Sequence, residues 1–115
     1  MSNEVPGEVH VSNDVLADLA GKAISNCYGV VGMAAPSTVD GIAHLLPQGR
    51  WRKGIDVTNG ETGVRVTPRV IIEYGTNINV VSQNVVEAVT FALRDYAQVP
   101  IESIDVVVAG VKVRK

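Results

Sequence analysis

The segment from residue 69 to residue 94 has the clearest hydrophobic pattern in the chain. It begins as an apolar strand, turns at Gly75, and continues as a long helix over residues 78–96. Apolar side chains recur in this helix every three or four residues, which is the helical period; they are Val81, Val85, Ala88, Val89, Ala92 and Tyr96. A second apolar set lies outside that stripe and consists of Val80, Val86, Phe91 and Leu93. We expect this set to be either buried within the chain or covered by another chain, because a surface helix needs only one apolar face.

Shorter apolar runs predict five strands. They cover Glu8–Val11, Val30–Ala34, Gly54–Thr58, Val64–Tyr74 and Ile104–Val113, with an Asn-Gly hairpin turn between the third and the fourth. Pro68 cannot donate a backbone hydrogen bond, so the fourth strand is expected to be an edge strand or to contain a bulge. The last strand is apolar on both faces, which predicts a central strand or one covered on both sides.

Two more helices are predicted before the long one. Ser12 or Asn13 is a suitable N-cap for a helix that ends near Asn26. A short helix follows from Ser37 or Thr38 to Leu46 and is ended by Pro47. The resulting order, β-α-β-α-β-β-α-β, predicts an α/β (α+β) two-layer sandwich in a single domain. We expect a mixed sheet of about five strands, two main helices and one short helix.

Composition narrows the class of protein. The 115 residues predict one domain, with residues 1–6 as a flexible arm and residues 7–113 as the folded unit. A net charge of −2 argues against binding to bulk nucleic acid. Cys27 is the only cysteine, which fits a reducing compartment. There is no signal-peptide pattern and no long apolar run. We therefore expect a cytoplasmic protein that reaches a membrane only through a partner and does not insert into it directly.

No group of residues predicts catalysis, a cofactor or a metal site. His10 and His44 lie on separate elements, without ligand-type neighbours at helical spacing. Cys27 lies on the apolar stripe of the first helix, so we expect a buried, inert thiol. Glu73, Gly75 and Asn77 form a strand-to-helix corner, where the Glu73 carboxylate is expected to contact free N–H groups of the following helix.

The sharpest local cluster is Arg50-Trp51-Arg52-Lys53, predicted to lie in a polar loop. Three cations around an indole could bind phosphate, anionic lipid or an acidic partner; the alternative is a solvated loop whose Trp51 covers the edge of the core. The segment Gly29–Gly32 has the GxxG spacing of RNA-binding KH domains, but it is apolar and leads into a strand, which favours a plain helix stop. A small nucleic-acid-binding module using residues 50–53 is the alternative function, and a small-ligand or enzymatic domain near Glu73 and Asn77 is a third.

Several sequence blocks, in this order along the chain, resemble the alkaline shock protein family of Gram-positive bacteria, the envelope stress response family. They are GVVGM at 29–33, GIA at 41–43, KGIDV at 53–57, EYGTNI at 73–78 and VVVAGV at 106–111. The resemblance covers about residues 7–113. It implies a cytoplasmic, non-enzymatic protein of cell-envelope homeostasis under alkaline or envelope stress.

The resemblance also implies self-assembly or attachment to a small membrane-anchored partner. We therefore expect an interaction or scaffold protein that forms a homo-oligomer, with nucleic acid an improbable partner. Its expected interface positions are Val80, Val86, Phe91 and Leu93.

Overall fold

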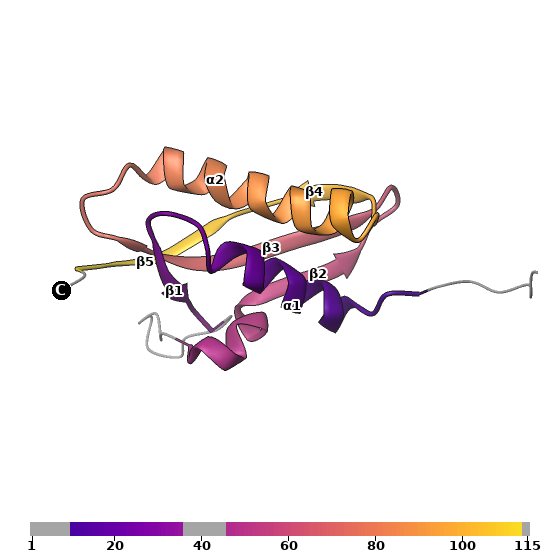
Figure 1. Cartoon of the computed structure of the whole chain (residues 1–115), viewed down its shortest axis with the longest axis horizontal. Coiled ribbons are helices and arrows are strands. Elements are labelled where there is room, and N and C mark those ends of the chain that lie inside the picture. Colours follow the sequence, from indigo (N-terminus) through magenta and orange to yellow (C-terminus); the bar gives the residue numbers. More distant parts are fainter. Residues whose placement is uncertain (1–9, 36–45, 114–115) are drawn as a thin grey trace, which may run out of the picture.

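One long strand, β3 (Val64–Glu73), pairs with all four other strands of the sheet (Figure 1). In this computed structural model, which describes residues 10–35 and 46–113, β2 (Ile55–Asn59) and then β1 (Val30–Met33) pair antiparallel with β3. The strands β4 (Ile101–Ile104) and β5 (Val107–Lys112) pair parallel with it. The predicted class, an α+β fold with a mixed sheet of about five strands, is confirmed.

The hydrogen bonds of β3 separate its four partners between its two edges. Val64 N–H donates to Pro100 O at 3.0 Å, and Val66 O accepts from Asp105 N–H at 2.9 Å, so these even-numbered residues bond towards the β4 segment. Arg69 O instead accepts from Ala34 N–H at 2.9 Å, next to β1. Because backbone groups of successive strand residues point to opposite edges, β1 and β2 follow one another along one edge, and β4 and β5 along the other.

Pro68 lies at the point where β3 changes partners. On one edge it faces Ile55, the first residue of β2. On the other edge β4 has ended opposite Val66, and β5 begins opposite Arg69. The missing N–H therefore falls in the gap between two short partner strands. The prediction of an edge strand around Pro68 is wrong, because β3 is the centre of the sheet.

The predicted last strand is also corrected. The segment predicted as this strand, Ile104–Val113, contains β5 and only the last residue of β4. Both β4 and β5 pair only with β3, at an edge of the sheet rather than at its centre. Val106 and Val108 pack against the core, whereas Val107 and Val111 are 41% and 51% exposed. Its apolar side chains on both faces therefore reflect one covered face and one open face.

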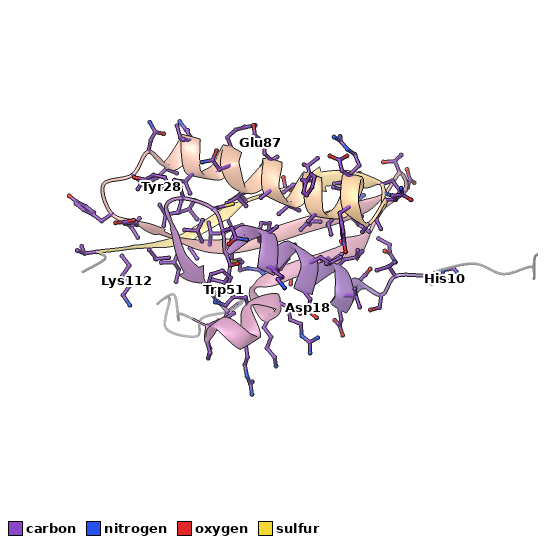
Figure 2. The ribbon with its side chains drawn as sticks, in the orientation of Figure 1. His10, Asp18, Tyr28, Trp51, Glu87 and Lys112 are labelled. Atoms are coloured by element: carbon purple, nitrogen blue, oxygen red, sulfur yellow. The ribbon has the colours of Figure 1, made fainter. Side chains whose placement is uncertain are left out.

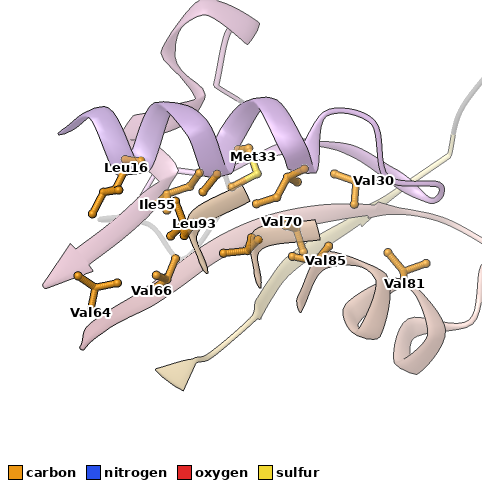
Figure 3. Close-up of a cluster of buried hydrophobic side chains, with 14 of the residues drawn as sticks. Leu16, Val30, Met33, Ile55, Val64, Val66, Val70, Val81, Val85 and Leu93 are labelled. Atoms are coloured by element: carbon orange, nitrogen blue, oxygen red, sulfur yellow. The ribbon is translucent and has the colours of Figure 1, made fainter. Parts of the chain in front are cut away.

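The helices α1 (Asn13–Ile24) and α2 (Ile78–Thr90) pack on the same face of the sheet and contact each other. The even-numbered side chains of β3 point towards them and form one buried cluster with both helices (Figure 3). This cluster contains Leu16, Ala17, Ala20, Ile24, Val30, Met33, Ile55, Val64, Val66, Val70, Ile72, Val81, Val85, Val89 and Leu93. The core is thus almost wholly aliphatic, and the architecture has two layers.

Side-chain caps fix where both helices begin. Ser12 Oγ accepts from Val15 N–H at 3.2 Å, which confirms Ser12 as the N-cap of α1. At the corner after β3, Asn77 Oδ1 accepts from Val80 N–H at 3.1 Å. The N-cap of α2 is therefore the Asn77 side chain, and the expected contact of the Glu73 carboxylate with this helix stays a prediction. Gly75 turns the chain there with a φ of 93°.

Two predicted elements lie mostly outside the described residues, and a predicted loop is helical. Residues 8 and 9 of the expected first strand lie outside the described residues, and His10–Ser12 is not a strand. The expected short helix at 37–46 also lies outside them, apart from Leu46, which is not helical and whose N–H donates to Met33 O at 2.8 Å. Arg50–Lys53 lies in a 3₁₀ helix, η1 (Gln48–Gly54), and not in a loop.

The last turns of the long helix widen into a π-helix, η2 (Phe91–Tyr96). Ala97 N–H donates to Ala92 O at 3.1 Å, a bond across five residues. The wider turn rotates the following side chains away from the spacing of an α-helix. Leu93 lies four residues after Val89, on the same buried side of the helix, and is in the core. Tyr96, which was expected on the buried stripe, follows the wider turn and is 72% exposed.

Two glycines with positive φ give a matched test of this packing. Gly29 has a φ of 88°, and a Cβ there would lie 2.5 Å from Val81 Cγ2, whereas a Cβ at Gly75 would meet nothing within 4 Å. We expect Gly75→Ala to lower the free energy of unfolding by about 1 kcal/mol, the backbone cost alone. Gly29→Ala should lower it by about 2–4 kcal/mol, since overpacking is added. Equal losses in urea denaturation would show that Gly29 and Val81 are not tightly packed.

Glu102 ties β4 to the hairpin between β2 and β3. Its Oε1 accepts from Thr62 N–H at 3.0 Å and from Thr62 Oγ1 at 3.2 Å, and Arg65 donates to its Oε2. The backbone bond from Thr62, followed by the Arg65 guanidinium, lowers the pKa of Glu102 from 4.5 to about 2. The ionised carboxylate is therefore favoured in the folded chain.

This shift predicts a pH-dependent difference between the wild type and Glu102→Gln. A carboxylate with a lowered folded pKa stabilises the fold above its unfolded pKa and loses that effect as pH falls through the folded value. The wild type should be more stable than the variant above a pH of about 4.5, and the gap should close towards pH 2. Thermal denaturation across this range measures it, with Glu61→Gln in the same turn as the control. A gap that stays constant with pH would contradict the assignment.

Candidate interaction surface

The four expected interface positions do not form one surface. Val80 and Phe91 are 52% and 64% exposed, Val86 is half-buried, and Leu93 is fully buried in the core. Leu93 is therefore wrong as an interface position, because it lies four residues after Val89 and shares the buried side of the helix. Val80 and Phe91 have the exposure that an interface role requires, and that role stays a prediction.

Polar side chains also interrupt the outer face of α2. Val80 and Phe91 are separated by three turns, roughly 16 Å along the helix axis. Gln83 and Glu87 lie between them, and Gln83 Nε2 donates to Glu87 Oε2 at 3.4 Å. The second apolar face expected from the sequence is therefore two separate apolar positions, and each has to be considered with its own neighbours.

Phe91 belongs to an apolar groove between α1 and the end of the long helix. We call this hollow of about 340 Å³ the helix groove; it is lined by Leu19, Lys22, Ala23, Asn26, Ala88, Phe91, Ala92 and Tyr96. Phe91 and Tyr96 are both largely exposed. Lys22 is the one charged residue in this lining. The helix groove thus offers two aromatic side chains and a cation to solvent.

A second hollow lies on the other side of α1, against η1. It encloses about 270 Å³ and is lined by Asp18, Gly21, Lys22, Ser25, Gly49, Trp51 and Arg52. Figure 2 shows Trp51 and Asp18 in this region, below and in front of the sheet. We call it the η1 hollow. Lys22 lines both hollows, so the two are neighbouring parts of one surface on either side of α1.

The four residues of the expected basic cluster, Arg50–Lys53, have different surroundings in the 3₁₀ helix η1. Trp51 is half-buried and packs against the core, which confirms that the indole covers the edge of the core. Arg52 Nη1 lies 3.4 Å from Asp18 Oδ2, an exposed ion pair. Arg50 and Lys53 are exposed, and no carboxylate of residues 10–35 and 46–113 pairs with either. Only part of the cluster therefore reaches the η1 hollow.

The surroundings of Cys27 do not activate its thiol. Cys27 is half-buried, with its Sγ 3.8 Å from Ala23 O and 3.7 Å from Asn84 O. Burial raises the pKa of the Cys27 thiol, which keeps it protonated and unreactive near neutral pH. The described part of the chain has no group of three His, Cys, Asp or Glu side chains able to hold a metal ion. His44 lies outside the described residues.

The GxxG segment has the structure that the strand interpretation predicts. Gly29 lies in the turn after α1, and Val30–Met33 is β1. Glu73 N–H donates to Gly29 O at 2.8 Å, so this turn is part of the sheet edge. A KH-type loop between two helices is therefore not present at Gly29–Gly32.

Sequence reasoning did not identify Leu19, Lys22 and Tyr96 as parts of one surface. Leu19, Ala23 and Asn26 have helical spacing along α1, and this signal was available. Their position against Phe91 depends on two helices packing side by side on the sheet. That arrangement, and the π-helical turn that exposes Tyr96, were not visible in the periodicity.

Comparison with known proteins agrees with this description. The chain is 32% identical over 108 residues to the uncharacterized protein YloU of Bacillus subtilis, covering 93% of this chain and 90% of that one. It is 32% identical over 112 residues to an uncharacterized protein of Streptococcus pyogenes, covering 96% and 93%. No helix of the described residues is long and apolar enough to cross a membrane.

Solved structures with the same fold include the MamM CTD in zinc and cadmium forms. They align with a TM-score of 0.50 and 14% identity over 90% of this chain, and over 87% and 98% of theirs. At this identity the likeness concerns the fold alone.

A family model for the alkaline shock protein 23 family matches residues 1–113, which confirms the resemblance drawn from the sequence blocks. The chain therefore belongs to this family, whose function is related to the cell envelope.

Proposed function

We propose that this chain is a non-enzymatic interaction domain that acts as an assembling scaffold in cell-envelope stress. The observation that carries the proposal is the helix groove, where Phe91 and Tyr96 are 64% and 72% exposed beside Leu19 and Ala92. The fifteen-residue buried cluster contains neither aromatic side chain. Their exposure therefore does not serve the core of this chain.

Large exposed aromatic side chains favour a binding role on physical grounds. Phenylalanine and tyrosine are among the side chains that contribute most to protein interfaces, because each buries a large area with few rotatable bonds. Full burial of an exposed phenylalanine is worth about 1.5–3 kcal/mol, and Phe91, which is 64% exposed, can contribute part of this. A second copy of the chain, or a partner held at the membrane, would recover this free energy by covering the groove.

The cell envelope-related function of the family supports a place of action next to the membrane. The family has a cell envelope-related function, and a small membrane-anchored protein would hold the chain close to the envelope from the cytoplasmic side. In this proposal the chain supplies the helix groove and the partner supplies the membrane attachment. Because Phe91 lies in the groove, a second copy and a membrane-held partner would compete for the same groove.

Sedimentation velocity of the wild type and two variants tests the self-assembly part of the proposal. The wild type should sediment faster as its concentration rises through the micromolar range. Phe91→Ser should remain a monomer over the same range, because the main aromatic contact is lost. Gln83→Ser, an exposed position on the outer face of the same helix, should behave like the wild type.

Two results would contradict the proposal. One is a wild type that remains monomeric at the highest concentration reached. The other is a Phe91→Ser variant that assembles as the wild type does. Circular dichroism of each variant confirms that the fold is intact before sedimentation is compared.

A further inference from the structure

The surface around α1 carries positive charge that the described residues do not neutralise. Lys22, Arg50 and Lys53 have no carboxylate within salt-bridge distance in the described ranges. Arg52 pairs only with Asp18, at 3.4 Å, and both side chains are about half exposed. This local excess of cations stands out because the whole chain has a net charge of −2.

Lys22 connects these cations to the apolar groove. It lines the helix groove together with Leu19 and Phe91, and it lines the η1 hollow together with Arg52. A ligand that lies along the exposed side of α1 therefore meets apolar side chains on one flank. On the other flank it meets two cations, Lys22 and Arg52, beside the single carboxylate of Asp18. This pattern is complementary to a molecule with an apolar face and an adjacent acidic face.

We propose that this surface binds an amphipathic helix of a partner protein that carries carboxylates along one side of its apolar face. Its apolar side chains would occupy the helix groove between Leu19 and Phe91. Its Asp or Glu side chains would lie over α1 and pair with Lys22 and Arg52. The inference deepens the proposed function, since it names the chemistry of the partner that an interaction domain of this shape accepts.

The shape of the surface favours a helix over other anionic ligands. On α1 the groove extends from Leu19 to Asn26, roughly 10 Å or two helical turns, which suits apolar anchors at i, i+4 and i+7. Nucleic acid would match the cations but would leave Leu19 and Ala23 without an apolar partner. An anionic membrane would need apolar and basic side chains on one convex face, whereas Leu19 and Trp51 line two separate hollows.

Trp51 supplies a direct readout, because it is the single tryptophan of the chain and lines the η1 hollow. The probe is a synthetic helical peptide of about 16 residues, roughly 24 Å long. It lacks tryptophan, and it has a leucine stripe flanked by glutamates. A second peptide has glutamine in place of every glutamate, and a third has lysine. Each is titrated into the full chain at low salt while the emission of Trp51 is recorded.

We expect saturable binding of the glutamate peptide and binding about tenfold weaker for the glutamine peptide, as two exposed ion pairs allow. Lys22→Glu should weaken binding of the glutamate peptide at least about fivefold and should give binding to the lysine peptide. Lys112→Glu makes the same charge change at the end of β5 and should leave all affinities unchanged.

Equal binding of the glutamate and glutamine peptides, or none of either, would overturn the inference. So would stronger binding of a single-stranded oligonucleotide or of phosphatidylserine vesicles than of the glutamate peptide in the same titration. This failure is distinguishable from failure of the proposed function, because the sedimentation test changes Phe91 and Gln83 and leaves Lys22 and Arg52 intact. A chain that assembles through Phe91 but does not select the acidic peptide keeps its scaffold role and loses this partner.

Discussion

The alternation of side chains along β3 is the constraint on which the rest of the structure depends. Val64, Val66, Val70 and Ile72 point to one face and are buried under both helices. On the other face, Arg65 and Arg69 pair with Glu102 and Asp56. Both helices therefore pack on the face that carries these four apolar side chains, and they lie side by side. The helix groove lies between the two helices, where small side chains such as Ala23 and Ala88 leave space.

Much of this fold could be predicted from local chemistry. The Ser12 hydroxyl marks the start of α1 because it accepts a hydrogen bond from Val15 N–H. Gly75 marks a turn because it adopts a positive φ. The apolar period of α2 identified Val81, Val85 and Val89 as core residues. These features depend on residues a few positions apart, and the sequence records them directly. The sequence blocks that resemble the family include such local features, for example Gly75 and the N-cap Asn77 in the block at 73–78.

The features that sequence reasoning missed depend on distant partners or on a changed helical period. A strand with apolar side chains on both faces is buried on both only if a layer covers each face. One face of β5 is open, and Val107 on it is exposed. The exposure of Tyr96 follows from a π-helical bond between Ala97 and Ala92, which α-helical periodicity does not anticipate. The grouping of Lys22 with Arg52 requires η1 to pack on α1. Each of these missed features changes the candidate surface more than it changes the fold.

The central claim is that the chain works through the helix groove, and the most direct measurement is site-specific photo-crosslinking in the native cell. A photoreactive benzoylphenylalanine is placed at position 91 in the groove, at position 83 on the outer face of α2, or at position 107 on the open sheet edge. We expect protein adducts from position 91 in clear excess over the other two positions. Adducts from position 107 or 83, with none from position 91, would contradict it and would assign the interaction to another surface.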